Sequence, residues 1–139
     1  MDEGVAIFVR RGDAATLLFA LDLAMTALVA GERVIVGLFQ GGLGAWATVV
    51  SGAEVPAGDG PWEPLVVAGR GGSAGARVRE SIGACRGLGR GRLEILACGG
   101  DAERLGLDGD ALVTAGAVDD VVGLPTLWRR ARSLKVVAL

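Results

Sequence analysis

The chain alternates short runs of hydrophobic residues with longer stretches of helix-forming residues. The runs at 5–9 (VAIFV) and 33–39 (RVIVGLF) consist mainly of strand-forming residues, as in strands buried on both faces of a sheet. Between them, residues 14–30 are strong helix formers, with Asp13 as a candidate N-cap and Gly31 as a stop signal. This order predicts two parallel strands joined by a right-handed crossover.

The pattern weakens in the middle of the chain. Glycines and prolines punctuate residues 40–64, which we expect to form a long loop with at most a short helix at 45–50. A short extended piece at 65–68 follows this loop. Ser73 is then placed to cap a helix that ends near Leu88.

The C-terminal part returns to strands and helices. Residues 92–98 (RLEILAC) predict a buried strand, and residues 101–105 the start of a helix. We expect another helix at 118–132, with Pro125 as a break or a first-turn residue, and a final strand at 134–138. Alternating strands and helices predict an α/β fold, a three-layer sandwich with a mainly parallel sheet of four or five strands.

The amino-acid composition narrows the classes of function that this chain can have. The 139 residues fit a single domain over 1–139, and a net charge of -2 gives no reason to expect nucleic acid as a partner. The chain has no histidine and no tyrosine, which excludes Ser-His-Asp catalysis and histidine metal sites. Two cysteines alone cannot form a structural zinc site, so we expect neither a metal nor a cofactor.

The start of the chain gives no targeting signal. Residues 1–3 (MDE) lack the basic region of a secretory signal peptide. The apolar stretch at 14–30 contains Asp22 and is too short for a membrane span. We therefore expect a cytoplasmic protein without a membrane segment, where free thiols are ordinary.

Cys98 stands where chemistry is common in such folds. It ends a predicted strand and is followed directly by Gly99, Gly100 and Asp101, ahead of a predicted helix. Ligands of open α/β sheets bind at the carboxyl ends of strands, and a helix N-terminus favours a thiolate. Cys98 is therefore the candidate catalytic residue, and Gly99, Gly100 and Asp101 are its candidate supporting residues.

Other residues are weaker candidates. Arg10 and Arg11 follow the first strand at the same sheet edge and, if close to Cys98, would stabilise a thiolate or bind an anion; a solvated turn is the alternative. Cys85 falls within a predicted helix, where we expect simple packing, although the sequence leaves a resolving role open.

The order of elements resembles the DsrE/DsrF-like family of small sulfur-relay proteins. The resemblance covers nearly the whole chain. It rests on the opening strand and apolar helix (5–30), on the strand that ends in an aromatic residue followed by glycines (34–42), and on the strand ending in Cys98 that leads to Leu105-Gly106-Leu107. The last features that support the resemblance are a helix containing valine and glycine and, after it, a short terminal strand.

This resemblance implies a function that needs no histidine. It implies a sulfur carrier that holds a persulfide on Cys98 and passes it to a partner thiol; whether it acts as a sulfurtransferase enzyme is left open. It also implies sulfur donor and acceptor proteins and assembly into trimers or hexamers. The residues that follow Cys98 and the 40–64 segment depart from the pattern we associate with the family, which leaves the substrate open.

Two alternatives remain. One is a non-catalytic oligomeric module in which Cys98 is an inert buried thiol. The other is a nucleotide or small-ligand protein that uses the glycine-rich turn at 69–75 to cradle a phosphate.

Three tryptophans complete the sequence-based expectations. Trp46 and Trp62 lie in the expected loop, where large aromatic residues are typical of an interface, and they favour a homo-oligomer. Trp128 is expected to lie in the core, and the three arginines between 129 and 132 on a solvated face.

Overall fold

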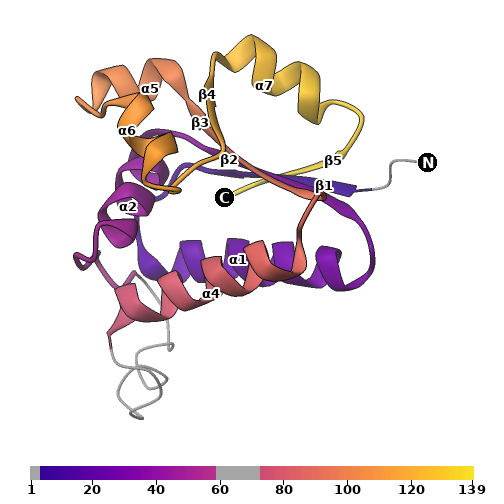
Figure 1. The fold of residues 1–139 in the computed structure, drawn as a ribbon, viewed down its shortest axis with the longest axis horizontal. Coiled ribbons are helices and arrows are strands. Elements are labelled where there is room, and N and C mark those ends of the chain that lie inside the picture. The colour runs from indigo at the N-terminus through magenta and orange to yellow at the C-terminus, as the bar shows by residue number, and fades with distance from the viewer. Residues whose placement is uncertain (1–3, 59–72) are drawn as a thin grey trace.

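The protein is built on a five-stranded sheet in which every neighbouring pair of strands is parallel (Figure 1). This computed structural model describes residues 4–58 and 73–139. The strands are β1 (Gly4–Val9), β2 (Arg33–Leu38), β3 (Leu93–Cys98), β4 (Asp120–Val122) and β5 (Lys135–Ala138). They lie in the order β4-β3-β2-β1-β5, so that β2 separates β3 from β1.

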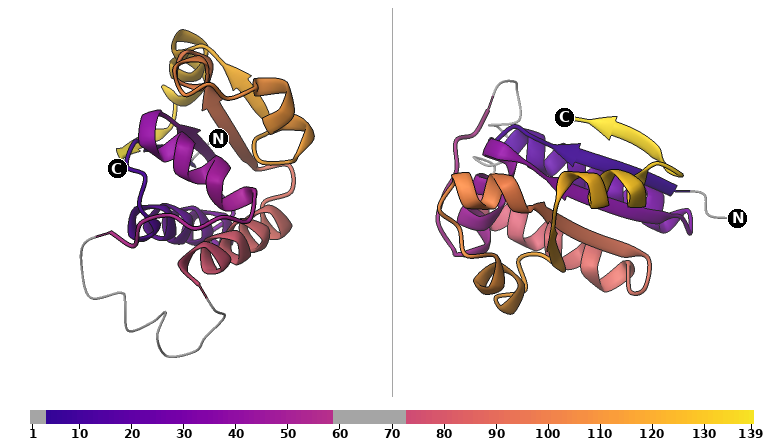
Figure 2. Two further views of the ribbon diagram at one scale, coloured as in Figure 1. Left: turned by 90° about the vertical axis from the view of Figure 1, so that its left-hand side faces the viewer. Right: turned by 90° about the horizontal axis from the view of Figure 1, so that it is seen from above.

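Helices cover both faces of this sheet, as the sequence predicts (Figures 1 and 2). The helices are α1 (Ala14–Val29), α2 (Gln40–Val50), α4 (Ala74–Leu88), α5 (Gly99–Arg104), α6 (Gly109–Thr114) and α7 (Leu124–Ala131). The long helices α1 and α4 pack together on one face, and the short α7 lies on the other. The expected three-layer α/β sandwich is confirmed. Within the described ranges, no helix combines the length and apolar character needed to cross a membrane.

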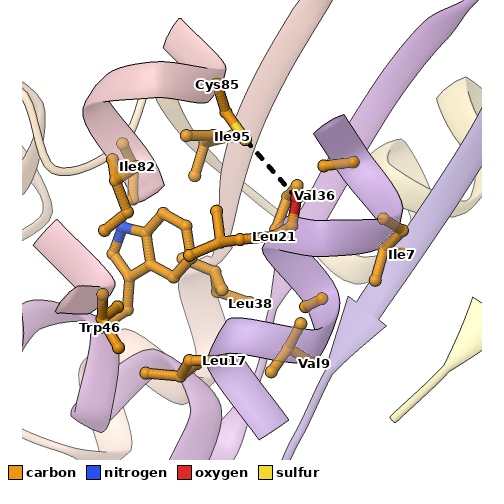
Figure 3. Close-up of a cluster of buried hydrophobic side chains, with 14 of the residues drawn as sticks. Ile7, Val9, Leu17, Leu21, Val36, Leu38, Trp46, Ile82, Cys85 and Ile95 are labelled. Carbon is orange, nitrogen blue, oxygen red and sulfur yellow. Dashed lines mark hydrogen bonds between the residues drawn. The ribbon is translucent and has the colours of Figure 1, made fainter. Parts of the chain in front are cut away.

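Side chains alternate between two separate cores. On β3, Ile95 and Ala97 point into the larger cluster beneath α1, α2 and α4, whereas Leu96 and Cys98 point into a smaller cluster beneath α7. Figure 3 shows part of the larger cluster, in which Trp46 from α2 packs among side chains of the strands and of the long helices. The sheet itself separates the two cores.

The helix signals of the first half are confirmed. Asp13 caps α1 by accepting the Thr16 N–H at 3.0 Å, and Gly31 follows the helix with a φ of 83°. The Ser73 hydroxyl accepts the Ala76 N–H at 3.1 Å, and α4 ends at Leu88 as expected.

The loop expected from residue 40 is wrong for its first part, because α2 begins at Gln40 directly after β2. Its glycines are poor helix formers, but close packing requires one of them, Gly42. A Cβ on Gly42 would lie 2.4 Å from the Val9 carbonyl oxygen, so only glycine fits there. The apolar side chains of the helix then bury against the sheet. The extended piece expected at 65–68 lies outside the described residues.

The helix expected over 118–132 is also wrong in its first part. Residues 120–122 form the edge strand β4, and α7 begins only at Leu124, with Pro125 in its first turn. A strand of three residues is too short to show an alternating pattern in the sequence. The final strand starts at Lys135, one residue later than expected.

Two of the tryptophan expectations are reversed. Trp46 is fully buried and donates its indole N–H to the Ala117 carbonyl at 2.9 Å, so it belongs to the core and not to an interface. Trp128 is 54% exposed because its neighbour Leu127 takes the inward position on α7. Trp62 lies outside the described residues.

An ionic cluster holds α7 to the sheet. Glu94 of β3 accepts from Arg33 of β2 and from Arg130 of α7, each at 3.2 Å. Together with the buried Leu127 and Ala131, this cluster fixes α7 above the strands.

The start of α4 is capped from a distance in the sequence. Glu54 accepts from the Ser73 hydroxyl at 2.7 Å and from the Gly75 N–H at 3.1 Å. These two hydrogen bonds, with the Ser73 hydroxyl as the larger cause, lower the pKa of Glu54 from its ordinary value of 4.5. The carboxylate thus adds a second cap, distant in sequence, to the helix N-terminus that Ser73 already caps.

Replacing this carboxylate should change stability in a pH-dependent way. A lowered pKa means that the charged form of Glu54 contributes stability above about pH 4.5 and that this contribution is lost as pH falls through the lower, folded-state pKa. Glu54→Gln should therefore lower Tm modestly at neutral pH, and the difference from the wild type should vanish in acid. Thermal unfolding followed by circular dichroism between pH 3 and 7 measures this.

Glu80→Gln is the matched control, because Glu80 is exposed on α4 and makes no side-chain hydrogen bond or ion pair with the described residues. An equal loss of Tm in both variants, or a Glu54→Gln effect that persists in acid, would contradict the assigned cap.

Candidate functional site

The site is centred on the junction between β3 and α5. Cys98 is both the last residue of β3 and the N-cap residue of α5, with extended backbone angles (φ −72°, ψ 119°). The helix therefore begins at Gly99, two residues earlier than the sequence suggests, and no loop separates strand from helix. Cys98 lies at the carboxyl edge of the sheet, where it was expected.

The surroundings of Cys98 are apolar. Its side chain belongs to the cluster beneath α7, with Phe39 from β2's end and Leu127 from α7, and Val122 is its register partner on β4. Cys98 is 6% exposed. Among the described residues, no group forms a hydrogen bond with its thiol. The sulfur is thus buried at the carboxyl edge of the sheet.

Cys85 has a different environment and a structural role. It is 2% exposed, and its thiol donates to the Leu21 carbonyl at 3.5 Å (Figure 3). Burial, and secondly the charge of Asp22, raises the pKa of the Cys85 thiol. This environment disfavours a reactive thiolate.

The two cysteines lie on opposite sides of the sheet. Cys85 belongs to the larger core, and Cys98 to the smaller core beneath α7. A disulfide needs Cα atoms within about 7 Å with side chains directed at each other. Because the sheet lies between them, Cys85 cannot act as a resolving cysteine for Cys98 in this fold.

Gly99 and Gly100 leave the first turn of α5 bare. A Cβ on Gly99 would lie 3.6 Å from the Val122 carbonyl oxygen, an ordinary contact, and one on Gly100 would lie 3.3 Å from the Arg104 guanidinium. Packing therefore does not demand glycine at Gly99. A side chain at Gly99 would face β4, and one at Gly100 would face Arg104.

Asp101 connects the junction between β3 and α5 with the junction between β2 and α2. Its buried carboxylate accepts the Gln40 N–H at 3.0 Å and pairs with Arg104 at 3.2 Å. Gln40, the first residue of α2, has a φ of 48°, which is unfavourable for a residue other than glycine. Asp101 thus holds a strained backbone in place and fixes α5 beside α2.

A small open hollow lies at this connection. It has a volume of about 290 Å³ and is lined by residues from the starts of α2 and α5 and from the end of α5: Gln40, Gly41, Asp101, Arg104 and Leu105. The strained turn at Gln40 was not predicted. The aromatic residue followed by glycines at the end of β2 was its only sequence signal.

Arg10 and Arg11 follow a strand that is not a neighbour of β3. Their strand, β1, is separated from β3 by β2, which puts their backbone about 10 Å from that of Cys98 at the usual strand spacing. The Arg10 N–H bonds to the Leu139 carbonyl at 2.9 Å, and the exposed Arg11 lies 3.6 Å from the Asp13 carboxylate. Of the expected supporting residues, the structure places Gly99, Gly100 and Asp101 at the junction.

The glycine-rich turn at 69–75 is described only from Ser73 onward. There, the Ser73 hydroxyl and the Gly75 N–H already bind the Glu54 carboxylate. These are groups that a phosphate at the start of α4 would need, which argues against that use of the turn. In the described ranges, no three histidine, cysteine or acidic side chains form a group that could hold a metal ion.

Comparisons with known proteins show similarity of fold. No protein-family model and no curated protein matches the chain. A solved structure described as "Protein of Unknown Function MTH1491 from Methanobacterium thermoautotrophicum" is similar, with a TM-score of 0.60 and 17% sequence identity. The similarity covers 99% of this chain and 100% of that one. At this identity the comparison supports the α/β fold and says nothing about activity.

The connection through Asp101 can be tested by substitution. Asp101→Ala removes the acceptor of the Gln40 N–H and leaves the strained turn unsupported, so we expect a loss of about 1–3 kcal/mol in the free energy of unfolding. Asp101→Asn keeps a carbonyl oxygen as acceptor and should lose less. Chemical denaturation measures both, and an Asp101→Ala variant as stable as the wild type would refute the role.

Proposed function

We propose that the protein carries sulfane sulfur on Cys98 and passes it to a partner thiol. The observation that carries the proposal is the position of Cys98, on the residue where β3 ends and α5 begins, at the carboxyl edge of a parallel sheet. Cys85 cannot share this role, because it is buried on the other side of the sheet with a raised pKa. The proposal agrees with the family resemblance of the sequence.

The chemistry is an exchange between sulfur atoms. The Cys98 thiolate attacks the outer sulfur of a donor persulfide, R–S–SH, so that the donor S–S bond breaks and a new S–S bond forms on Cys98. The thiolate RS⁻ leaves, and the proton stays on the transferred sulfur. An acceptor thiolate then attacks this outer sulfur and releases Cys98 as a thiolate. The oxidation state of the transferred sulfur does not change, so no external oxidant or reductant takes part.

The surroundings suit a carried sulfur. The apolar side chains of Phe39, Val122 and Leu127 around Cys98 shelter a persulfide from water. The first turn of α5 carries no side chains at Gly99 and Gly100, next to Cys98. A reducing cytoplasm is the compartment that we propose for this thiol chemistry.

One observation favours a second candidate, a non-catalytic module with an inert Cys98. The thiol is largely buried in an apolar cluster and, within the described ranges, has no hydrogen-bond partner, which is typical of cysteines that only fill space. The two candidates differ in the measured reactivity of Cys98.

Sulfur loading separates the two. The reduced protein is treated with a low-molecular-weight persulfide, and the added sulfur is located by mass spectrometry of peptides. We expect the added mass on Cys98, a complete loss of loading in Cys98→Ser, and nearly unchanged loading in Cys85→Ser, because the Cys85 thiol is buried and hydrogen-bonded. Transfer to an added acceptor thiol should then restore the original mass.

Alkylation rates in the folded protein provide the control. Cys98 should react several times faster than Cys85, and both should react equally after unfolding. If Cys98 takes no sulfur and is alkylated as slowly as Cys85, the inert module is the better description. If Cys85 is loaded instead, the assignment of the site is wrong.

A further inference from the structure

Apolar side chains border Cys98 on both flanks and from the helix above. Val122 of β4 is its register partner on one flank. On the other flank, the register of β2 and β3 places Phe39, the residue after β2, alongside Cys98. Leu127 of α7 belongs to the same buried cluster and covers it from the helix side. The space around the thiol is therefore set by side chains of three neighbouring elements.

The ring of Phe39 is held in one place by close packing. It makes an edge contact with Phe8 of β1, with the ring centroids 5.2 Å apart and the ring planes at 61°. Gly37 makes room for this pair, because a Cβ there would lie 3.0 Å from the Phe8 ring and 3.2 Å from the Phe39 ring. Phe39 is itself only 8% exposed. A ring packed this closely cannot swing aside without displacing its neighbours.

Sulfur exchange makes demands on the space beside the thiol. In the displacement described above, the attacking sulfur, the transferred sulfur and the leaving sulfur lie nearly in line. Because an S–S bond is only about 2 Å long, the group carried by the leaving sulfur stays close to Cys98. Cys98 is 6% exposed, so a bulky leaving group meets the bordering side chains before the sulfur atoms can react. A donor made of sulfur alone carries no such group.

We propose that Phe39 is a specificity-determining residue, which limits the sulfur donors of Cys98 to slim molecules such as inorganic polysulfide and excludes the persulfides of bulky thiols. The proposal rests on the proposed function and names the class of donor for the same site. A protein that offers a persulfide is bulkier still, so this donor class differs from the donor proteins that the family resemblance implies. Delivery is less restricted, because the carried sulfur extends the side chain by about 2 Å.

The smallest such donor is HS–SH. The Cys98 thiolate bonds to one of its sulfur atoms and becomes Cys98–S–SH, while the S–S bond of the donor breaks and HS⁻ leaves with the electron pair of that bond. The proton of the transferred sulfur stays in place. The sulfur of Cys98 is oxidised by as much as the leaving sulfur is reduced, so the donor is the only co-reactant.

Loading rates with a slim and a bulky donor test the proposal. The reduced, folded protein is treated with sodium disulfide or with glutathione persulfide, and the initial rate of sulfur addition to Cys98 is measured by mass spectrometry of peptides. The ratio of the two rates is divided by the same ratio in the unfolded protein, which removes the difference in intrinsic reactivity. We expect a normalised ratio of about 10 or more for the wild type, equivalent to about 1.4 kcal/mol in activation free energy.

Two substitutions of Phe39 should lower this ratio. Phe39→Ala opens one flank of Cys98 and should bring the normalised ratio close to one. Phe39→Leu should lower it part of the way, and it keeps an apolar side chain in the cluster, so it provides the test if circular dichroism shows that Phe39→Ala does not fold.

Leu134→Ala is the matched control. Leu134 is 7% exposed in the same cluster, but it precedes β5 at the amino end of the sheet, away from Cys98. Truncating it weakens the cluster without opening the flank of the thiol, so its normalised ratio should stay that of the wild type.

The possible outcomes separate this proposal from the proposed function. A wild-type ratio near one, Phe39 variants that keep the wild-type ratio, or a Leu134→Ala ratio as low as that of Phe39→Ala would each overturn the role of Phe39. These results would leave the sulfur-carrier function standing, because sulfur still reaches Cys98. If neither donor loads Cys98 in the folded wild type while both load the unfolded protein, the proposed function is wrong, and this proposal with it.

Discussion

Strand β3 divides its side chains between two cores, and the positions of both cysteines relative to each other follow from this division. Ile95 and Ala97 point to the side of α4, which carries Cys85, while Leu96 and Cys98 point to α7. A shift of one residue in the register of β3 would exchange the two sets. The separation of a structural thiol from a thiol at the sheet edge is thus a property of strand periodicity.

The two faces of the sheet are covered unequally. One face carries the long helices α1 and α4 with a continuous hydrophobic core. The other carries the 8-residue α7, held by Leu127, Ala131 and the contacts of Glu94 with two arginines. The proposed sulfur site lies at the less covered face, where fewer side chains of the protein itself compete for space.

Local sequence patterns predicted the structural features that depend on residues close together in the chain. The Asp13 cap, the parallel pair of β1 and β2, and Cys98 at the end of a strand could all be read from the chain. The start of α2 could not, because its glycines are explained only by the Val9 carbonyl that lies against Gly42. The position of Arg10 could not be read either, because the order of strands, which places β2 between β1 and β3, leaves no mark on the sequence. The predictions for Trp46 and Trp128 failed for a similar reason. Whether a helical position faces a sheet depends on how the helix is placed.

The hydrogen bond from Trp46 to Ala117 has a consequence for the rim of the sheet. β4 is only 3 residues long and has a single neighbour, yet the segment before it is fastened by side chains: Trp46 to Ala117, Arg86 to Asp119, and Asp119 to the Ile95 N–H. Both outermost strands also begin with a charged residue, Asp120 in β4 and Lys135 in β5. Natural sheets resist the uncontrolled addition of strands by having edge strands that are short, charged and held in place. This resistance matters in a chain whose mean hydropathy is +0.48. These features disfavour edge-to-edge pairing of this sheet with other strands.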